Sequence, residues 1–113
     1  MYDLGKIGEN AACDYLKSLK YIIIARNFHS RFGEIDLIAR QHQRIIFIEV
    51  KTRKSEKYRT ASEAVNYSKL AKITKTAHIY LKQKKLIDVE YRFDVVEVIG
   101  ADLKINHIQN ITL

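Results

Sequence analysis

The chain has 113 residues, a length typical of one domain, and we expect residues 1–113 to fold as a single unit. Its content of 47% hydrophobic and 29% charged residues excludes an intrinsically disordered protein. The single cysteine, Cys13, excludes an internal disulfide. The formal net charge of +7 favours a polyanionic partner such as nucleic acid, because binding then releases counterions.

Charged residues are spread through the first twenty positions, which excludes the apolar core of a signal peptide. No apolar run approaches the roughly 20 residues that a membrane helix needs. We therefore expect a cytoplasmic protein that does not bind membranes.

The first half of the chain predicts one helix and three strands. Apolar residues recur every three or four positions over residues 3–20, which indicates a helix. Runs rich in β-branched residues predict strands at 21–25, 34–40 and 45–52. The polar, basic stretch 53–60 indicates a loop.

The second half predicts a helix over 62–84, with Ser62 as its N-cap, and a strand over 91–99. Residues 103–111 alternate weakly, which is compatible with an added edge strand. Three consecutive strands predict an antiparallel meander, and the helix that follows them predicts a crossover to a parallel strand. The expected fold class is α/β, with an αβββαβ order and a mixed sheet flanked by helices.

Charges interrupt two of the predicted apolar strands. Asp36 lies in the second strand, and Glu49 and Lys51 share one face of the third. A hairpin loop with an even number of residues, either 42–43 or 41–44, would put Asp36 directly opposite Glu49. A loop with an odd number of residues would put the two carboxylates on opposite faces of the sheet.

Two carboxylates that face each other repel unless a cation lies between them, and oxygen ligands of this kind suit Mg²⁺ or Mn²⁺. Such a metal can activate a phosphodiester for hydrolysis. Lys51 could then orient the attacking water or neutralise charge on the phosphate. The alternative is that Asp36, Glu49 and Lys51 form a structural ion-pair cluster on a solvated sheet face.

The order Asp36, then Glu49-Val50-Lys51, resembles the Asp…Glu-x-Lys core of the PD-(D/E)XK nuclease superfamily. A closer resemblance is to the YraN family of small bacterial proteins, described as endonuclease-like. It extends over nearly the whole chain, through residues 8–9, 26–27, 33–37, 47–53, 64–65, 69 and 92–96. The chain departs from the common pattern at Lys20 and His42, which stand where turn glycines are frequent.

This resemblance implies a restriction-endonuclease-like core with a catalytic site that includes Lys51 and a metal held by Asp36, Glu49 and Val50. The similar Holliday-junction resolvases also use a glutamate of the first helix, and Glu9 stands at the matching position. The implied function is a Mg²⁺- or Mn²⁺-dependent endonuclease acting on DNA, with branched DNA as a candidate substrate and a homodimer as a candidate assembly. The alternatives are a nucleic-acid-binding module of the same fold that cleaves weakly or not at all, and an assembly partner that binds protein.

Basic residues around the predicted site are candidates for nucleic-acid contacts, although each could instead belong to a solvated surface. Those of the predicted loop 53–60 are accompanied by an aromatic residue that could stack on a base. Others recur on one ridge of the second predicted helix. The candidates are Arg53, Lys54, Lys57, Tyr58, Arg59, Lys69 and Lys72, with Lys75 on the same ridge. Glu34 is either a neighbour of the site or merely exposed.

Overall fold

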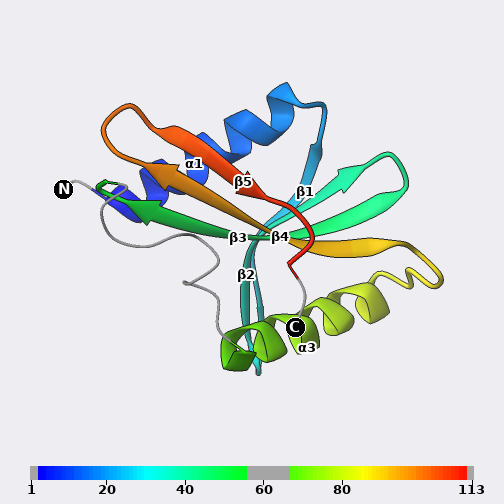
Figure 1. Cartoon of the computed structure of the whole chain (residues 1–113). Helices are drawn as coiled ribbons and strands as arrows, with labels where there is room; N and C mark the ends of the chain where they lie inside the picture. The colour runs from blue at the N-terminus through cyan, green and yellow to red at the C-terminus, as the bar shows by residue number, and fades with distance from the viewer. Residues whose placement is uncertain (1–2, 56–66, 112–113) are drawn as a thin grey trace.

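The computed structural model describes residues 3–55 and 67–111, which form a five-stranded sheet between two helices (Figure 1). The elements are α1 (Leu4–Ser18), β1 (Ile22–Ser30), β2 (Gly33–Gln41), β3 (Arg44–Arg53), α3 (Tyr67–Gln83), β4 (Tyr91–Ile99) and β5 (Lys104–Ile108). Helix α1 covers one face of the sheet and α3 the other (Figure 1). The αβββαβ order is confirmed, and β5 adds the edge strand that the weak alternation allowed.

The strands follow one another across the sheet in chain order, β1-β2-β3-β4-β5. The pairs β1–β2, β2–β3 and β4–β5 are antiparallel, whereas β3 and β4 are parallel. The predicted meander followed by a crossover is therefore correct. Strand β3 lies in the centre of the sheet, which explains why residues 45–48 are all buried apolar residues.

Each face of the sheet has its own hydrophobic core. The α1 side contains Leu16 of the helix packed against Ile46, Ile48 and other residues of the sheet. The α3 side contains Tyr80 and Ile73 packed against Phe47 and its neighbours. Odd-numbered residues of β3 face α3, so Glu49 and Lys51 lie on the same face of the sheet as this core, beyond Phe47 along the strand.

Helix α1 ends two residues before the predicted boundary, in a turn that explains the unusual Lys20. The N–H of Lys20 donates to the carbonyl of Lys17, and the N–H of Tyr21 donates to that of Leu16. This is the Schellman arrangement, and it requires the left-handed backbone that Lys20 adopts at φ 72°. Lys20 thus occupies the position that glycine commonly fills.

Strand β1 is longer than predicted, because its polar second half still pairs with β2 from Arg26 to Ser30. An edge strand is paired on one side only and tolerates exposed polar residues. The apolar run 21–25 therefore underestimated the length of the strand. The predicted N-cap Ser62 lies outside the described residues. Within the described ranges, neither helix has the length and apolar character needed to span a bilayer.

Candidate active site

The β2–β3 hairpin fixes the two carboxylates relative to each other. Gln41 pairs with Arg44, so the loop has two residues, and His42 takes the left-handed φ of 56° that such a turn needs. Leu37 lies opposite Ile48, which makes Asp36 and Glu49 the next facing residues. The even-loop prediction is confirmed.

Asp36 and Glu49 meet where β2 and β3 stop pairing through their backbones. The Val50 N–H donates to Asp36 Oδ2 at 2.7 Å, so a side chain takes the place of a β-ladder acceptor. Burial, followed by the hydrogen bond with Glu49 and the charge of Glu49, raises the pKa of Asp36 from 3.8 to about 7. With a pKa of about 7, Asp36 is protonated for much of the time near neutral pH.

Two lysines complete the cluster. Lys69 reaches across from α3, and its Nζ lies 3.3 Å from Glu49 Oε2. The side chains of Lys51 and Lys69 lie close enough to each other to affect each other's pKa. Burial, together with this contact, lowers the pKa of Lys51. Burial opposes the charge on Lys69, but the contact with Lys51 and the charge of Glu49 outweigh it and raise the pKa of Lys69.

The carboxylates open into a hollow of about 430 Å³ between β2, β3 and the start of α3. Lys72 is exposed at its rim, and Glu34 also lines it. Glu34 is exposed and forms an ion pair with His29 at 2.9 Å, so it lies beside the cluster rather than within it. The other lining residues are Gly33, Asp36, Glu49, Ser68, Lys69 and Ile73.

The donor chemistry of this cluster fits a hard divalent cation. No group of three or more His, Cys, Asp and Glu side chains suited to a metal occurs among residues 3–55 and 67–111. Mg²⁺ commonly takes only one or two carboxylates and completes its shell with water and substrate oxygens. The N–H and C=O of a strand residue point to the same side, so the Val50 carbonyl is directed toward the side occupied by Asp36.

Glu9 reaches the sheet, but at β1 rather than at the carboxylates. Its Oε1 accepts hydrogen bonds from Arg26 Nη2 at 3.0 Å and Asn27 Nδ2 at 3.1 Å. Asn27 lies between residues that pair with Leu37 and Ile35, and thus next to Asp36. Glu9 is therefore one residue removed from the cluster, and its catalytic role stays a prediction.

The predicted basic loop begins later than expected, which changes the position of Arg53. Strand β3 continues through Arg53, whose side chain is only 12% exposed and forms an ion pair with Glu97 of β4. The buried Glu97 needs a cation, and Arg53 supplies it. The prediction that Arg53 belongs to the loop 53–60 was therefore wrong, and its contact with nucleic acid stays a prediction. Lys54 is exposed, whereas Lys57, Tyr58 and Arg59 lie outside the described residues.

Sequence reasoning missed two buried acids of β4. Both are charged residues in an apolar strand, which is the pattern that identified Asp36. Glu97 is one, and it neighbours Lys51 in the parallel register. The other is Asp94, on the α1 side. Asp94 accepts hydrogen bonds from Arg92 at 2.9 Å, from His107 at 2.8 Å and from the Asn110 N–H at 3.0 Å.

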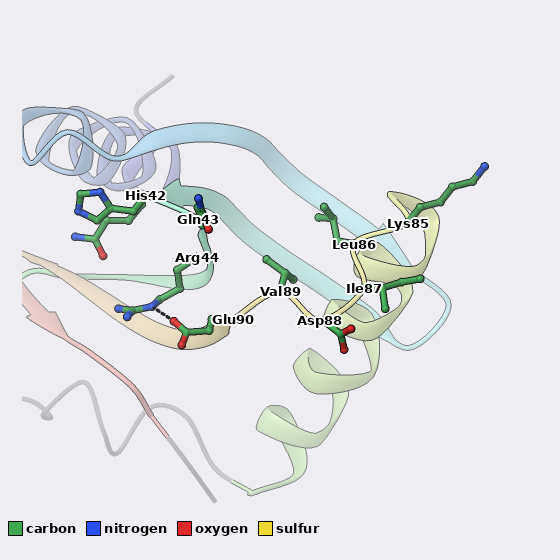
Figure 2. A pocket seen from close by; sticks show the side chains of 10 residues that line it. His42, Gln43, Arg44, Lys85, Leu86, Ile87, Asp88, Val89 and Glu90 are labelled. Carbon is green, nitrogen blue, oxygen red and sulfur yellow. Dashed lines mark hydrogen bonds and ion pairs between the residues drawn. The ribbon is translucent and has the colours of Figure 1, made fainter.

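A larger hollow, of about 740 Å³, lies between the β2–β3 turn and the segment that joins α3 to β4 (Figure 2). Arg44 and Glu90 form an exposed ion pair beside it, with 3.3 Å between Nε and Oε2 (Figure 2). It lies at the other end of β3 from Glu49, and its charges are exposed and mixed in sign. The convergent carboxylates therefore mark the stronger candidate for chemistry.

Comparison with known proteins gives a consistent set of relatives. The model of the uncharacterised protein family UPF0102 matches residues 8–98. The UPF0102 protein of Clostridium botulinum strain 657, type Ba4, is 48% identical over 106 residues, which cover 93% of this chain and 86% of the relative. A UPF0102 protein of Clostridium kluyveri is 45% identical over 97 residues, which cover 86% of this chain and 80% of the relative.

Proposed function

The chain belongs to the uncharacterised protein family UPF0102, and we propose that it is an endonuclease that hydrolyses phosphodiester bonds of DNA with Mg²⁺ or Mn²⁺. The observation that carries this proposal is the meeting of Asp36 and Glu49 with two lysines in an open hollow. The order Asp…Glu-x-Lys and the basic net charge of +7 support it. Both agree with a place in the PD-(D/E)XK nuclease superfamily.

In this proposal the acids hold the metal. Asp36 and Glu49 provide carboxylate oxygens, and the Val50 carbonyl provides a main-chain oxygen on the same side of β3. A bound Mg²⁺ or Mn²⁺ would supply Lewis-acid activation of the phosphodiester and of water. A bound dication would favour the ionised form of Asp36, whose pKa is raised in its absence.

The lysines have different roles in this proposal. Lys51 has a lowered pKa and can accept a proton from the attacking water, or orient that water. Lys69 keeps its positive charge and can face the scissile phosphate, where it would stabilise the charge that develops in the transition state. Lys72, at the rim of the hollow, can contact a neighbouring phosphate.

One observation favours a second candidate, a DNA-binding module that does not cleave. Lys69 already forms an ion pair with Glu49, and Asp36 can be neutralised by its proton. Neither acid is thus left with an uncompensated negative charge in the absence of a metal ion, as expected of a site with a purely structural role.

A cleavage assay with Mn²⁺ on four-way junctions, flaps, duplexes and single strands separates the two candidates. We expect the parent to cut at least one substrate, and Asp36→Asn and Lys51→Ala each to reduce the rate by about 100-fold or more. Glu34→Gln is the matched control, because it makes the same acid-to-amide change in the same hollow at an exposed residue. Its activity should equal that of the parent.

Calorimetry with Mn²⁺ adds a readout that does not depend on turnover. Asp36→Asn should lose Mn²⁺ binding, whereas Lys51→Ala should keep it. If Asp36→Asn cleaves as fast as the parent, the activity arises elsewhere and the proposal fails. A parent that binds DNA but cuts none of the four substrates would support the binding module.

A further inference from the structure

The turn between β1 and β2 is fastened to α3 close to the candidate site. Ser30 Oγ and the buried Thr76 Oγ1 lie 2.8 Å apart, and Ser30 Oγ also accepts from the Phe32 N–H at 3.1 Å. The backbone at Gly33 packs close to Lys72, since a Cβ added to Gly33 would lie 3.6 Å from Lys72 Cβ. The turn is therefore held in a defined position beside the hollow.

Two cations share one aromatic ring at this turn. Arg31 Cζ lies 4.9 Å from the centroid of the Phe32 ring, and Lys75 Nζ of α3 lies 5.1 Å from it. Both cations belong to exposed residues, so they remain accessible to a ligand. The ring attracts each of them, so both cations are held beside the same aromatic side chain.

Within the described part of the chain, neither Arg31 nor Lys75 has an acidic partner, and the nearby Glu34 is paired with His29. An anion that contacts both cations would offset their mutual repulsion. A phosphate group suits this position, because guanidinium and ammonium groups both donate hydrogen bonds to phosphate oxygens.

The shared ring stands at the end of a row of lysines that starts at the carboxylates. Lys69 contacts Glu49, Lys72 lines the hollow, and Lys75 reaches the turn. These lysines recur every three residues on α3, so Lys75 lies about 9 Å along the helix axis from Lys69. That length corresponds to roughly one to two nucleotide steps of a duplex strand, because successive phosphates are displaced around the duplex as well as by about 3.4 Å along its axis.

We propose that Arg31, Phe32 and Lys75, which we call the phosphate clamp, bind a backbone phosphate one or two nucleotides from the one held at the carboxylates. The clamp fixes the path of the bound strand along α3, and Phe32 keeps its two cations together. The identity of the ligand as nucleic acid rests on the proposed function.

The test measures DNA binding without metal ion, in EDTA, using a labelled duplex and a labelled four-way junction over a series of salt concentrations. Arg31→Ala and Lys75→Ala should each weaken binding about three- to tenfold at low salt. Each should also reduce the slope of log affinity against log salt by about one unit, because one phosphate contact is lost.

Two further variants make the result specific to the clamp. Phe32→Leu keeps both cations but removes the ring that positions them, so affinity should fall while the salt slope changes little. Lys82→Ala removes an exposed lysine from the last turn of α3, away from the clamp, and should behave as the parent. Thermal unfolding of each variant excludes loss of folding as the cause of a loss of binding.

The outcomes separate this inference from the proposed nuclease. If Arg31→Ala and Lys75→Ala bind DNA as Lys82→Ala does, the clamp is wrong, while cleavage by the parent would still support the nuclease. If the clamp variants lose binding but the parent cuts nothing, the clamp holds and the nuclease fails. A parent that binds no DNA at low salt would overturn the clamp.

Discussion

Asp36 is a carboxyl group whose protonated form is favoured in the folded protein, because burial and Glu49 raise its pKa from 3.8 to about 7. A raised carboxyl pKa means that stability is lost as the pH rises from about 4 through about 7. Asp36→Asn keeps the shape, and its amide oxygen can still accept from the Val50 N–H. We expect this variant to be more stable than the parent by roughly 1–3 kcal/mol at alkaline pH.

Urea unfolding near pH 8.5 and near pH 4 measures this effect. The extra free energy of unfolding of Asp36→Asn should nearly vanish at the lower pH, where Asp36 is largely protonated in the folded parent. Glu34→Gln provides the control at both values. A gain of equal size at both pH values would mean that repulsion between the carboxylates is not its cause.

In the proposed metal site Lys69 would compete with the metal for Glu49, since its Nζ lies 3.3 Å from Glu49 Oε2. Lys69→Met should therefore bind Mn²⁺ more tightly than the parent, by about two- to fivefold. This factor corresponds to the interaction free energy of one partly exposed ion pair. Cleavage of DNA should fall in the same variant, because the cation that faces the phosphate is lost.

Calorimetry and a cleavage assay on the same samples check both halves of this prediction. Lys72→Met is the matched control, because Lys72 lines the same hollow and is exposed. Tighter Mn²⁺ binding in both variants would indicate a general charge effect rather than competition at Glu49. Unchanged Mn²⁺ binding by Lys69→Met would refute the competition outright.

At the scale of single residues, local rules predicted part of the candidate cluster. Strand alternation and the parity of the hairpin loop were enough to bring Asp36 opposite Glu49. Lys69 was expected to contact a phosphate, but its pairing with Glu49 was not, because it depends on how α3 crosses the sheet. Arg53 was misread for the same reason, since its partner Glu97 lies on a distant strand.

Among the elements, α1 is positioned by a close contact between Gly8 and β3. A Cβ added to Gly8 would lie 2.0 Å from Thr52 Oγ1 and 3.0 Å from Thr52 Cβ, so either the Thr52 side chain or the helix would have to move. Gly8→Ala should destabilise the protein by about 1–3 kcal/mol, the usual cost of overpacking. Gly5→Ala is the matched control on the same helix, since its Cβ would only touch Asp3 Oδ1 at 3.5 Å.

Chemical unfolding of the two alanine variants gives the comparison. Gly5→Ala should be neutral or stabilising by up to about 1 kcal/mol, because alanine favours the helix. If Gly8→Ala is also neutral, α1 is not fixed against β3 at this point. Because Glu9 follows Gly8, loss of the contact should also disturb the hydrogen bonds from Glu9 to Arg26 and Asn27.

The elements themselves were largely predictable, and their ends were not. Periodicity identified the helix of residues 3–20, and runs of β-branched residues identified the three following strands. The helix end depended on the turn at Lys20, and the true length of β1 depended on pairing with β2. The first is a capping effect and the second a tertiary effect, and the hydropathy pattern predicts neither.

For the molecule as a whole, a buried polar network on the α1 side joins β4 to the C-terminal strand. Asp94 is bonded to Arg92, to His107 of β5 and to the Asn110 N–H, and His107 Nδ1 lies 2.9 Å from Tyr15 Oη of α1. Burial alone would raise the pKa of Asp94, but the bonds from His107 and Arg92 outweigh it and lower that pKa.

Asp94→Asn leaves Arg92 without its charged partner, so it should reduce the free energy of unfolding by about 3–5 kcal/mol near neutral pH. Because the pKa of Asp94 is lower in the folded protein than in the unfolded chain, its ionised form stabilises the fold. This stabilisation is present above the pKa of the unfolded chain and is lost as the pH falls through the pKa of the folded protein. The difference between parent and variant should therefore shrink below about pH 4. Urea unfolding with the exposed Asp102→Asn as control tests this, and equal loss in both variants would contradict it.

The two-residue turn at His42 and Gln43 limits how the gene can vary while the carboxylates stay together. A one-residue insertion there would move Glu49 and Lys51 to the face that packs against α1, unless a bulge restores the register. Insertions or deletions retained at this turn among functional relatives should therefore come in steps of two, or together with a compensating change in β2 or β3. A one-residue glycine insertion between His42 and Gln43 should abolish Mn²⁺ binding, whereas a two-residue insertion should preserve it.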